Sequence, residues 1–448
     1  MSLKRKCIAF CGFFRKYPPL VLPLVWLVFS VLIILVNCIP DRFVKQSIEA
    51  GINTLTAEGD HPWIFFTPQS QLDNFTDRIM LQMSQRTSSW NAVTQYFSKS
   101  AEWPELEANS LHNPVFAAFA NQGYPRYWHG YTVFLKPLLS FLSLEAIRSL
   151  SFLTLLILLC CAFYVLKTRF NLMIACVYCV AISMINIFIV PLSLVYSPVV
   201  YLTILSIVGI RYFCGQNRFL LFLLVGAFVN YVDFLTFPLL SLCFPLALVV
   251  VHDVKNNESF SRIVNRFIIS GIMWLVGYAS TWGVKWVLSS LITGRNVVKD
   301  AFVNILIRSD AGSHADADSH FDKIETIRSN YECFFKNYPI RLLALIILIV
   351  FVLQIFFIRQ KKLDCLTALT SMGKGSILLL LAVAPVVWYF CLANHSTIHM
   401  EFYAYKNVSI TVFSVLVYLC CLSIQKEDTS AIHLDDKSSN RCIGLNCK

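Results

Sequence analysis

The chain has 448 residues, of which 57% are hydrophobic and only 14% are charged. Soluble domains carry roughly 25% charged residues, so this composition excludes a soluble globular protein and predicts a polytopic membrane protein. The net charge of +11 does not predict nucleic-acid binding, because the Lys and Arg residues fall mainly between hydrophobic segments, where they orient helices. Most of the Cys residues lie inside apolar runs and are expected to pack as small hydrophobic side chains.

In chain order, the sequence predicts an all-α protein with ten transmembrane helices, since about 20 apolar residues cross a bilayer. The predicted spans are 20–38, 148–166, 171–190, 194–211, 219–234, 236–252, 266–291, 341–358, 376–393 and 408–424. The apolar stretch 131–147 contains Lys136, Pro137 and Glu145, which favours an interfacial or re-entrant helix.

The distribution of basic residues predicts the orientation. Residues 1–19 and alternate connections between the spans are rich in Lys and Arg, so both termini are expected in the cytoplasm of an inner or plasma membrane. Residues 40–130, 292–340 and 394–407 are then outer loops of one transmembrane domain, 20–424. Residues 425–448 are polar without periodicity and are expected to form a disordered cytoplasmic tail.

The first outer loop supplies the candidate general bases. Asp73 and Asp77, in Leu72-Asp73-Asn74-Phe75-Thr76-Asp77, place two carboxylates on the face where a membrane enzyme working outside the cytoplasm needs one. Asp60 and Glu58 precede them. Later in the loop, Arg126, Tyr127, Trp128 and His129 form an aromatic run with two basic residues. This run fits an aromatic belt at the headgroups or a site for phosphate and sugar, because Arg pairs with phosphate and rings stack on sugars.

Charged residues near the outer ends of spans give further candidates. A carboxylate such as Asp233 is costly there unless it is paired or faces water. Lys285 either extends its amine to the interface or pairs with a lipid phosphate or with Asp233. The loop 292–340 predicts an amphipathic helix over 297–307, which carries Arg308 at its end, followed by an irregular stretch that would suit a lid.

The last outer loop contains His395 and His399, which share a helix face, followed by Tyr403 and Tyr405. Two histidines at this spacing suit a divalent cation, but no third ligand is adjacent, so we expect them to line a polar substrate cavity instead of holding a metal. Walker A, dinucleotide-binding and GxSxG patterns are absent from the sequence, which disfavours an ATP-driven pump, a nucleotide enzyme and a serine hydrolase.

A basic tail and first span, a large acidic outer loop with an interfacial helix and a long series of spans resemble the GT-C superfamily of polytopic glycosyltransferases. The strings LDNFTDRIML, YPRYWHGYTVFLKPL, NYVDFLTFP, TWGVKW and NHSTIHMEFYAY are similar to bacterial membrane proteins of that type. Unlike many members, this chain has no adjacent pair of acidic residues soon after its first span.

The resemblance implies inverting transfer of a sugar from a polyprenyl-phosphate donor in the membrane lipid to an envelope glycan. It assigns the base to Asp73 or Asp77 and makes Arg126, Lys285 and Arg308 candidates for the phosphate. A polyprenyl-sugar synthase and a flippase would supply the donor. The alternatives are a lipid-linked glycan flippase or secondary transporter, and a polymerase of the O-antigen type. A transporter is expected to show internal repeats and paired charges near the middle of the membrane, which the sequence does not contain.

Overall fold

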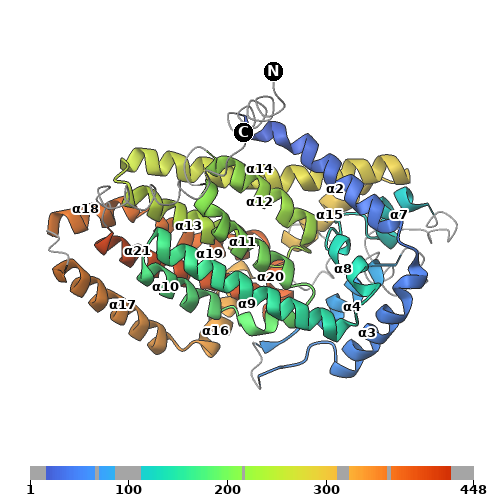
Figure 1. Ribbon diagram of the computed structural model, residues 1–448, viewed down its shortest axis with the longest axis horizontal. Coiled ribbons are helices and arrows are strands. Elements are labelled where there is room, and N and C mark those ends of the chain that lie inside the picture. The colour runs from blue at the N-terminus through green and yellow to red at the C-terminus, as the bar shows by residue number, and fades with distance from the viewer. Residues whose placement is uncertain are drawn as a thin grey trace, which may run out of the picture.

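The computed structural model describes residues 17–65, 70–85, 113–213, 217–309, 322–360 and 365–424, and these residues are almost entirely helical (Figure 1). Within them no strand forms; a single isolated bridge joins Trp63 to Gln71. The predicted all-α class is therefore confirmed. The predicted lid lies largely outside the described residues, as does the tail 425–448.

The helices follow one another along the chain with short connections. The first part forms α2 (Leu22–Asn37), α3 (Lys45–Glu58), α4 (Asn74–Met83), α7 (Pro114–Ala120) and α8 (Thr132–Leu139). The central part forms α9 (Leu144–Arg169), α10 (Leu172–Ser183), α11 (Ser197–Phe213), α12 (Arg218–Val232), α13 (Leu239–Lys255) and α14 (Phe260–Thr293). The last part forms α15 (Val297–Ser309), α16 (Lys323–Asn337), α17 (Ile340–Gln360), α18 (Cys365–Gly375), α19 (Leu378–Cys391), α20 (Ala393–Ile398) and α21 (Val408–Cys420). Short 3-10 turns are η1 (Pro18–Val21), η2 (Asp41–Phe43), η4 (Asn121–Gly123), η5 (Ile187–Leu192), η6 (Ala404–Asn407) and η7 (Cys421–Ser423).

Six described segments are long and apolar enough to cross a membrane, whereas the sequence predicts ten spans. They are Pro18–Asn37, Leu144–Arg169, Phe260–Thr293, Ile340–Gln360, Leu366–Cys391 and Ala404–Ser423. The predicted span 171–190 is divided. Helix α10 ends at Ser183, and Asn186 then adopts a left-handed conformation with φ 55° before η5. A helix of the length of α10 rises about 18 Å, which is less than the ~30 Å hydrocarbon thickness.

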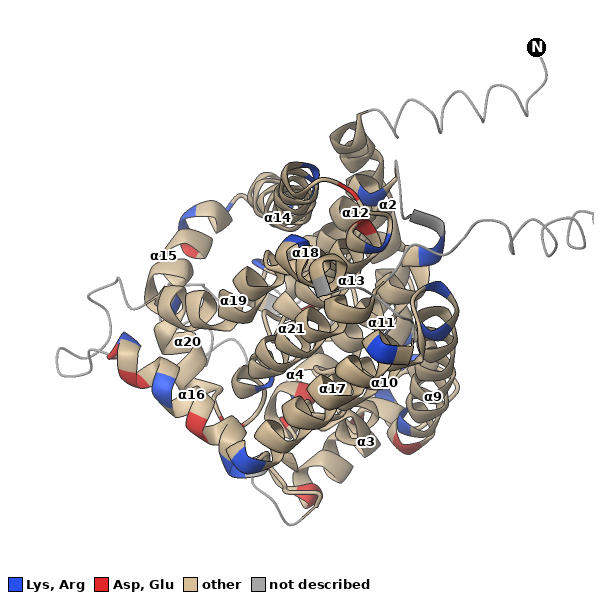
Figure 2. Cartoon of the chain, turned by 90° about the vertical axis from the view of Figure 1, so that its left-hand side faces the viewer, with Lys and Arg blue, Asp and Glu red and all other residues tan. Residues whose placement is uncertain are grey.

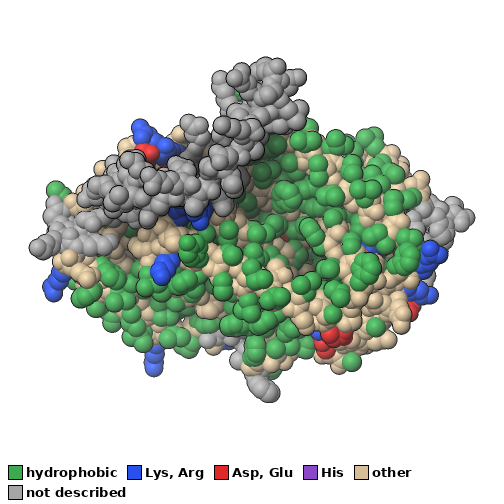
Figure 3. All heavy atoms as spheres, viewed as in Figure 1, with side chains coloured by type: hydrophobic (Ala, Val, Ile, Leu, Met, Phe, Trp, Pro, Cys, Tyr) green, Lys and Arg blue, Asp and Glu red, His purple; other side chains and the backbone are tan. Residues whose placement is uncertain are grey.

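The outer surface of the bundle is apolar. Most side chains of α17 are exposed and hydrophobic, and so are many on α9. Figure 3 shows hydrophobic side chains spread over much of one face, with charged side chains mainly toward its edges. In the view of Figure 2, Lys, Arg, Asp and Glu of α16 lie on the rim of the molecule. This distribution suits a protein surrounded by lipid.

Helices α12 and α14 pack with their backbones in contact. A Cβ atom added at Gly226 would lie 2.1 Å from the carbonyl oxygen of Trp274, and one at Gly277 would lie 2.1 Å from that of Leu223. Reciprocal small residues of this kind let membrane helices approach closely. The contact fixes the long α14 against the core, which matters because α14 carries one wall of a cavity described below.

The two ends of the bundle differ in their polar contacts. At the start of α12, Arg218 forms a buried bidentate pair with Asp253 of α13 at 2.6 and 3.0 Å, and Arg266 of α14 joins the same carboxylate at 3.1 Å. The opposite end carries α3, α4, α7 and α8 (Figure 1). There the predicted helix over 131–147 is broken, because α8 ends at Leu139 and Ser143 caps a new helix, α9.

Candidate functional site

Segments far apart in the sequence meet around a cavity of about 430 Å³, which we call the polar cavity. It is lined by His61, Asp73, Phe75, Thr76, Ile79, Tyr124, Val195, Phe234, Thr236, Asn304, Ile307, Arg308, Asn394, His395, Ile398, His399, Phe402 and Tyr403. Residues from all three predicted outer loops contribute to this wall. The polar groups of those loops therefore converge on one site.

Asp73 forms part of the wall of the polar cavity. Its side chain caps α4 by accepting hydrogen bonds from the Thr76 amide at 3.0 Å and the Thr76 hydroxyl at 2.7 Å. Burial raises the pKa of Asp73 above the ordinary 3.8, and the Thr76 bonds oppose that rise. Nδ1 of His61 lies 4.0 Å from Oδ1 of Asp73, and the His61 ring stacks on Phe402. A carboxylate with a raised pKa beside a cavity can serve as a general base.

Asp77 has a different environment although it is one helical turn away. It is 0% exposed and accepts hydrogen bonds from the amides of Leu194 and Val195, both at 2.9 Å, and from the Ser193 hydroxyl at 3.3 Å. Burial raises its pKa to about 7, opposed by those amides. Asp77 is not among the residues that line the polar cavity. It joins α4 to the turn before α11, so the structure separates the two candidate bases.

Arg308 and His395 are directly bonded in the wall of the polar cavity. Nη1 of Arg308 lies 2.6 Å from Nδ1 of His395, and Nε2 of His395 lies 2.8 Å from the Leu235 carbonyl oxygen. A carbonyl only accepts, so Nε2 carries the proton and Nδ1 accepts from Arg308. Burial and the charge of Arg308 lower the pKa of His395 well below 6.5. His395 is therefore neutral at physiological pH.

The other predicted residues of the last loop divide between the cavity and the core. His399 stacks on Tyr403 with ring centroids 4.8 Å apart, and both line the cavity. Burial lowers the pKa of His399 to about 3. Tyr405 instead is buried, and its hydroxyl accepts from Asn186 and Lys406 at 3.0 Å. Among the described residues, no cluster of three or more His, Cys, Asp or Glu has an arrangement that would hold a metal ion.

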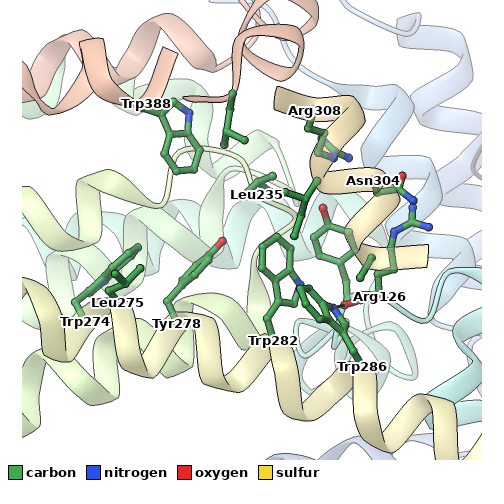
Figure 4. A pocket seen from close by; sticks show the side chains of 14 residues that line it. Arg126, Leu235, Trp274, Leu275, Tyr278, Trp282, Trp286, Asn304, Arg308 and Trp388 are labelled. Atoms are coloured by element: carbon green, nitrogen blue, oxygen red, sulfur yellow. Dashed lines mark hydrogen bonds between the residues drawn. The ribbon is translucent and has the colours of Figure 1, made fainter. Parts of the chain in front are cut away.

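A second cavity of about 230 Å³, which we call the aromatic groove, lies beside the first. It is lined by Arg126, Tyr127, Leu235, Trp274, Leu275, Tyr278, Trp282, Trp286, Ala301, Asn304, Ile305, Arg308, Trp388 and Leu392. In Figure 4 Trp274, Tyr278, Trp282 and Trp286 form a row along α14, and Trp388 faces them from the other side. Asn304 and Arg308 of α15 line both cavities, so the groove and the polar cavity meet at these residues.

The two arginines of the groove differ in their partners. Arg126 is buried and forms an ion pair with Asp300 at 2.6 Å, while its guanidinium lies over the Tyr124 ring. Within the described ranges, Arg308 has no carboxylate at ion-pair distance, and its printed partner is the neutral His395. Arg308 is thus the cation better able to hold an anionic ligand, whereas the charge of Arg126 is compensated within the protein.

Trp128 and His129 hold the loop in place instead of lining either cavity. Trp128 is fully buried and donates to the Thr281 carbonyl at 2.8 Å. His129 has φ 53°, donates from Nε2 to the Tyr124 carbonyl at 3.0 Å and accepts at Nδ1 from the Tyr131 hydroxyl at 3.2 Å. Burial lowers its pKa to about 3. Their prediction as substrate ligands is therefore not supported by their positions.

Lys285 and Asp233 also lie away from the lining of both cavities, and in the described part of the chain they form no ion pair with each other. Lys285 is 0% exposed and donates to the Ala118 carbonyl at 3.1 Å, with its amine over the rings of Phe119 and Trp128. Asp233 closes its own turn by accepting from the amide and hydroxyl of Thr236. Burial raises its pKa to about 6. Both charges serve local structure.

Several lining residues were not anticipated from the sequence: His61 beside Asp73, Asn304 at the junction, Asn394, and the aromatic row on α14. The row is the one with a readable signal, because residues 274, 278, 282 and 286 follow the i, i+4 spacing of a helix face. No family model, no curated protein and no solved structure matches this chain.

Proposed function

We propose that this protein is a membrane glycosyltransferase that moves a sugar from a polyprenyl-phosphate donor to an envelope glycan on the outer face of the membrane. The observation that carries the proposal is the junction of two unlike cavities at Arg308 and Asn304. One is an aromatic groove and the other is a polar cavity with Asp73 in its wall. A lipid-linked sugar has the same two parts, an apolar chain and a polar head.

In this arrangement the polyprenyl chain lies along the aromatic groove, and its phosphate lies at Arg308. Rings on α14 offer a broad apolar contact, and a guanidinium forms strong charge-assisted hydrogen bonds with phosphate oxygens. The sugar then occupies the polar cavity, where rings such as Phe402 and Tyr403 can stack on it. No nucleotide pocket is needed, because a separate synthase and flippase would supply the activated lipid.

The reaction that fits is a single displacement with inversion. Asp73 takes the proton of an acceptor hydroxyl, and the hydroxyl oxygen attacks the anomeric carbon of the donor sugar. The bond from that carbon to the phosphate oxygen breaks, and its electron pair leaves with polyprenyl phosphate. Arg308 stabilises the negative charge that develops on the leaving phosphate. The raised pKa of Asp73 makes it a stronger base than an ordinary carboxylate.

Asp73 is the better supported of the two candidate bases. Its wall position exposes it to a substrate in the cavity, whereas the oxygens of Asp77 are occupied by the amides of Leu194 and Val195. Glycan analysis of the cell envelope, with and without the gene, tests the proposal. Loss of one sugar from an envelope glycan supports it, and an unchanged set of glycans contradicts it.

A further inference from the structure

Arg308 is held by a chain of hydrogen bonds that begins on a different connection of the fold. The chain runs from the turn between α12 and α13, through His395 of α20, to Arg308 of α15. These segments are separated by more than seventy residues at each step. Such a connection between loops calls for an explanation beyond local packing.

The turn has an unusual backbone. Leu235 has φ 66°, a left-handed conformation that is rare and unfavourable for a bulky non-glycine residue. Asp233 supports it by accepting from the Thr236 amide at 3.1 Å and the Thr236 hydroxyl at 2.7 Å. The Leu235 carbonyl receives the Nε2 proton of His395 at 2.8 Å. The strained residue therefore supplies the acceptor that selects one tautomer of the histidine.

That tautomer is the one that can bind Arg308. With Nε2 protonated, Nδ1 presents a lone pair to the guanidinium, and their separation is 2.6 Å. One donor direction of Arg308 is thereby fixed, while its other nitrogen atoms are left for a ligand at the junction of the cavities. A neutral acceptor orients the cation without cancelling its charge, unlike the Asp300 carboxylate beside Arg126.

We propose that His395, oriented by the Leu235 carbonyl, is a positioning residue that holds the Arg308 guanidinium in the direction required to bind the donor phosphate. This inference rests on the proposed function. Since the effect of His395 passes through Arg308, removing His395 matters only while Arg308 is present. A residue with a purely structural role would weaken binding or stability equally in both backgrounds.

The test is binding of farnesyl phosphate to the purified full-length protein in detergent, followed by tryptophan fluorescence. Farnesol, which lacks the phosphate, is the control ligand. The dissociation constant should rise about tenfold for Arg308→Ala, the loss typical of one charge-assisted hydrogen bond or more. His395→Phe, which keeps a ring but neither hydrogen bond, should raise it about three- to tenfold. His395→Gln keeps a donor and an acceptor and should bind within about twofold of the wild type.

The double variant His395→Phe/Arg308→Ala should bind no more weakly than Arg308→Ala alone. The inference is overturned if His395→Phe binds like the wild type, or if the two losses multiply in the double variant. If His395→Phe does not fold, failure of His395→Gln to retain binding while it remains folded overturns it equally. If Arg308→Ala itself binds farnesyl phosphate normally, the proposed donor site fails, and that result is distinguishable from failure of the positioning role alone.

Discussion

Exchanging Asp73 and Asp77 for asparagine should have opposite consequences. Asn ranks with Asp as a helix N-cap, so Asp73→Asn can keep the hydrogen bond to the Thr76 amide and with it the start of α4. The amide cannot accept a proton from the acceptor hydroxyl at useful rates. We therefore expect transfer to fall about 10²–10⁴-fold, the usual effect of losing a general base, with little change in stability.

Asp77→Asn changes a carboxylate whose two oxygens accept from two backbone amides and a hydroxyl. The new amide group offers one accepting oxygen, so at least one buried donor loses its partner. Leaving such a group unsatisfied costs about 1–3 kcal/mol. The variant should unfold at a lower temperature in detergent but transfer sugar at a nearly normal rate per folded molecule.

The assay needs both readouts on the same preparations: envelope glycan modification in cells, normalised to folded protein in the membrane, and thermal unfolding of the purified variants. If Asp73→Asn modified the glycan normally, Asp73 would not be the base. If Asp77→Asn were inactive while as stable as the wild type, the base would be Asp77, and the division of roles drawn from their hydrogen bonds would be refuted.

Gly226→Ala should destabilise the protein by about 1–3 kcal/mol, because the new methyl group would overlap the Trp274 carbonyl, whereas Gly283→Ala on α14 meets no atom within 4 Å and should be neutral or slightly stabilising; equal melting temperatures would refute the tight crossing. Arg126→Gln should cost about 3–5 kcal/mol by leaving Asp300 buried and unpaired, and adding Asp300→Asn should recover part of that loss in the same melting assay. Transfer should decline as pH falls through a pKa above 3.8, because the base works in its ionised form and burial raises the pKa of Asp73; a pH–rate profile that stays flat well below pH 3.8 would contradict this.

Much of the architecture follows from hydrophobic patterning. The segments expected to be helical are helical, including 297–307, which lies within α15. The number of spans does not follow so directly, because a helix packed in the core is as apolar as one that faces lipid. Helix α10 shows the difficulty, since Asn186 ends a segment whose composition alone fits a full span.

The candidate site was predicted only in part. The convergence of outer-loop residues was anticipated from charge and topology, but which of them face a cavity depends on side-chain direction. Trp128 and Lys285 are examples, because a long-range bond to Thr281 and to Ala118 turns each into the core. The bond between Arg308 and His395 joins segments 87 residues apart, and no local pattern in a single sequence indicates it.

The most direct test of the central claim is transfer by the purified protein in proteoliposomes, supplied with radiolabelled polyprenyl-phosphate sugars or with the matching nucleotide sugars. Extracted envelope glycan serves as the acceptor. The proposed mechanism predicts that label enters the glycan only from a lipid-phosphate donor, and that Asp73→Asn abolishes this transfer. Label transferred directly from a nucleotide sugar in the absence of polyprenyl lipid would contradict it.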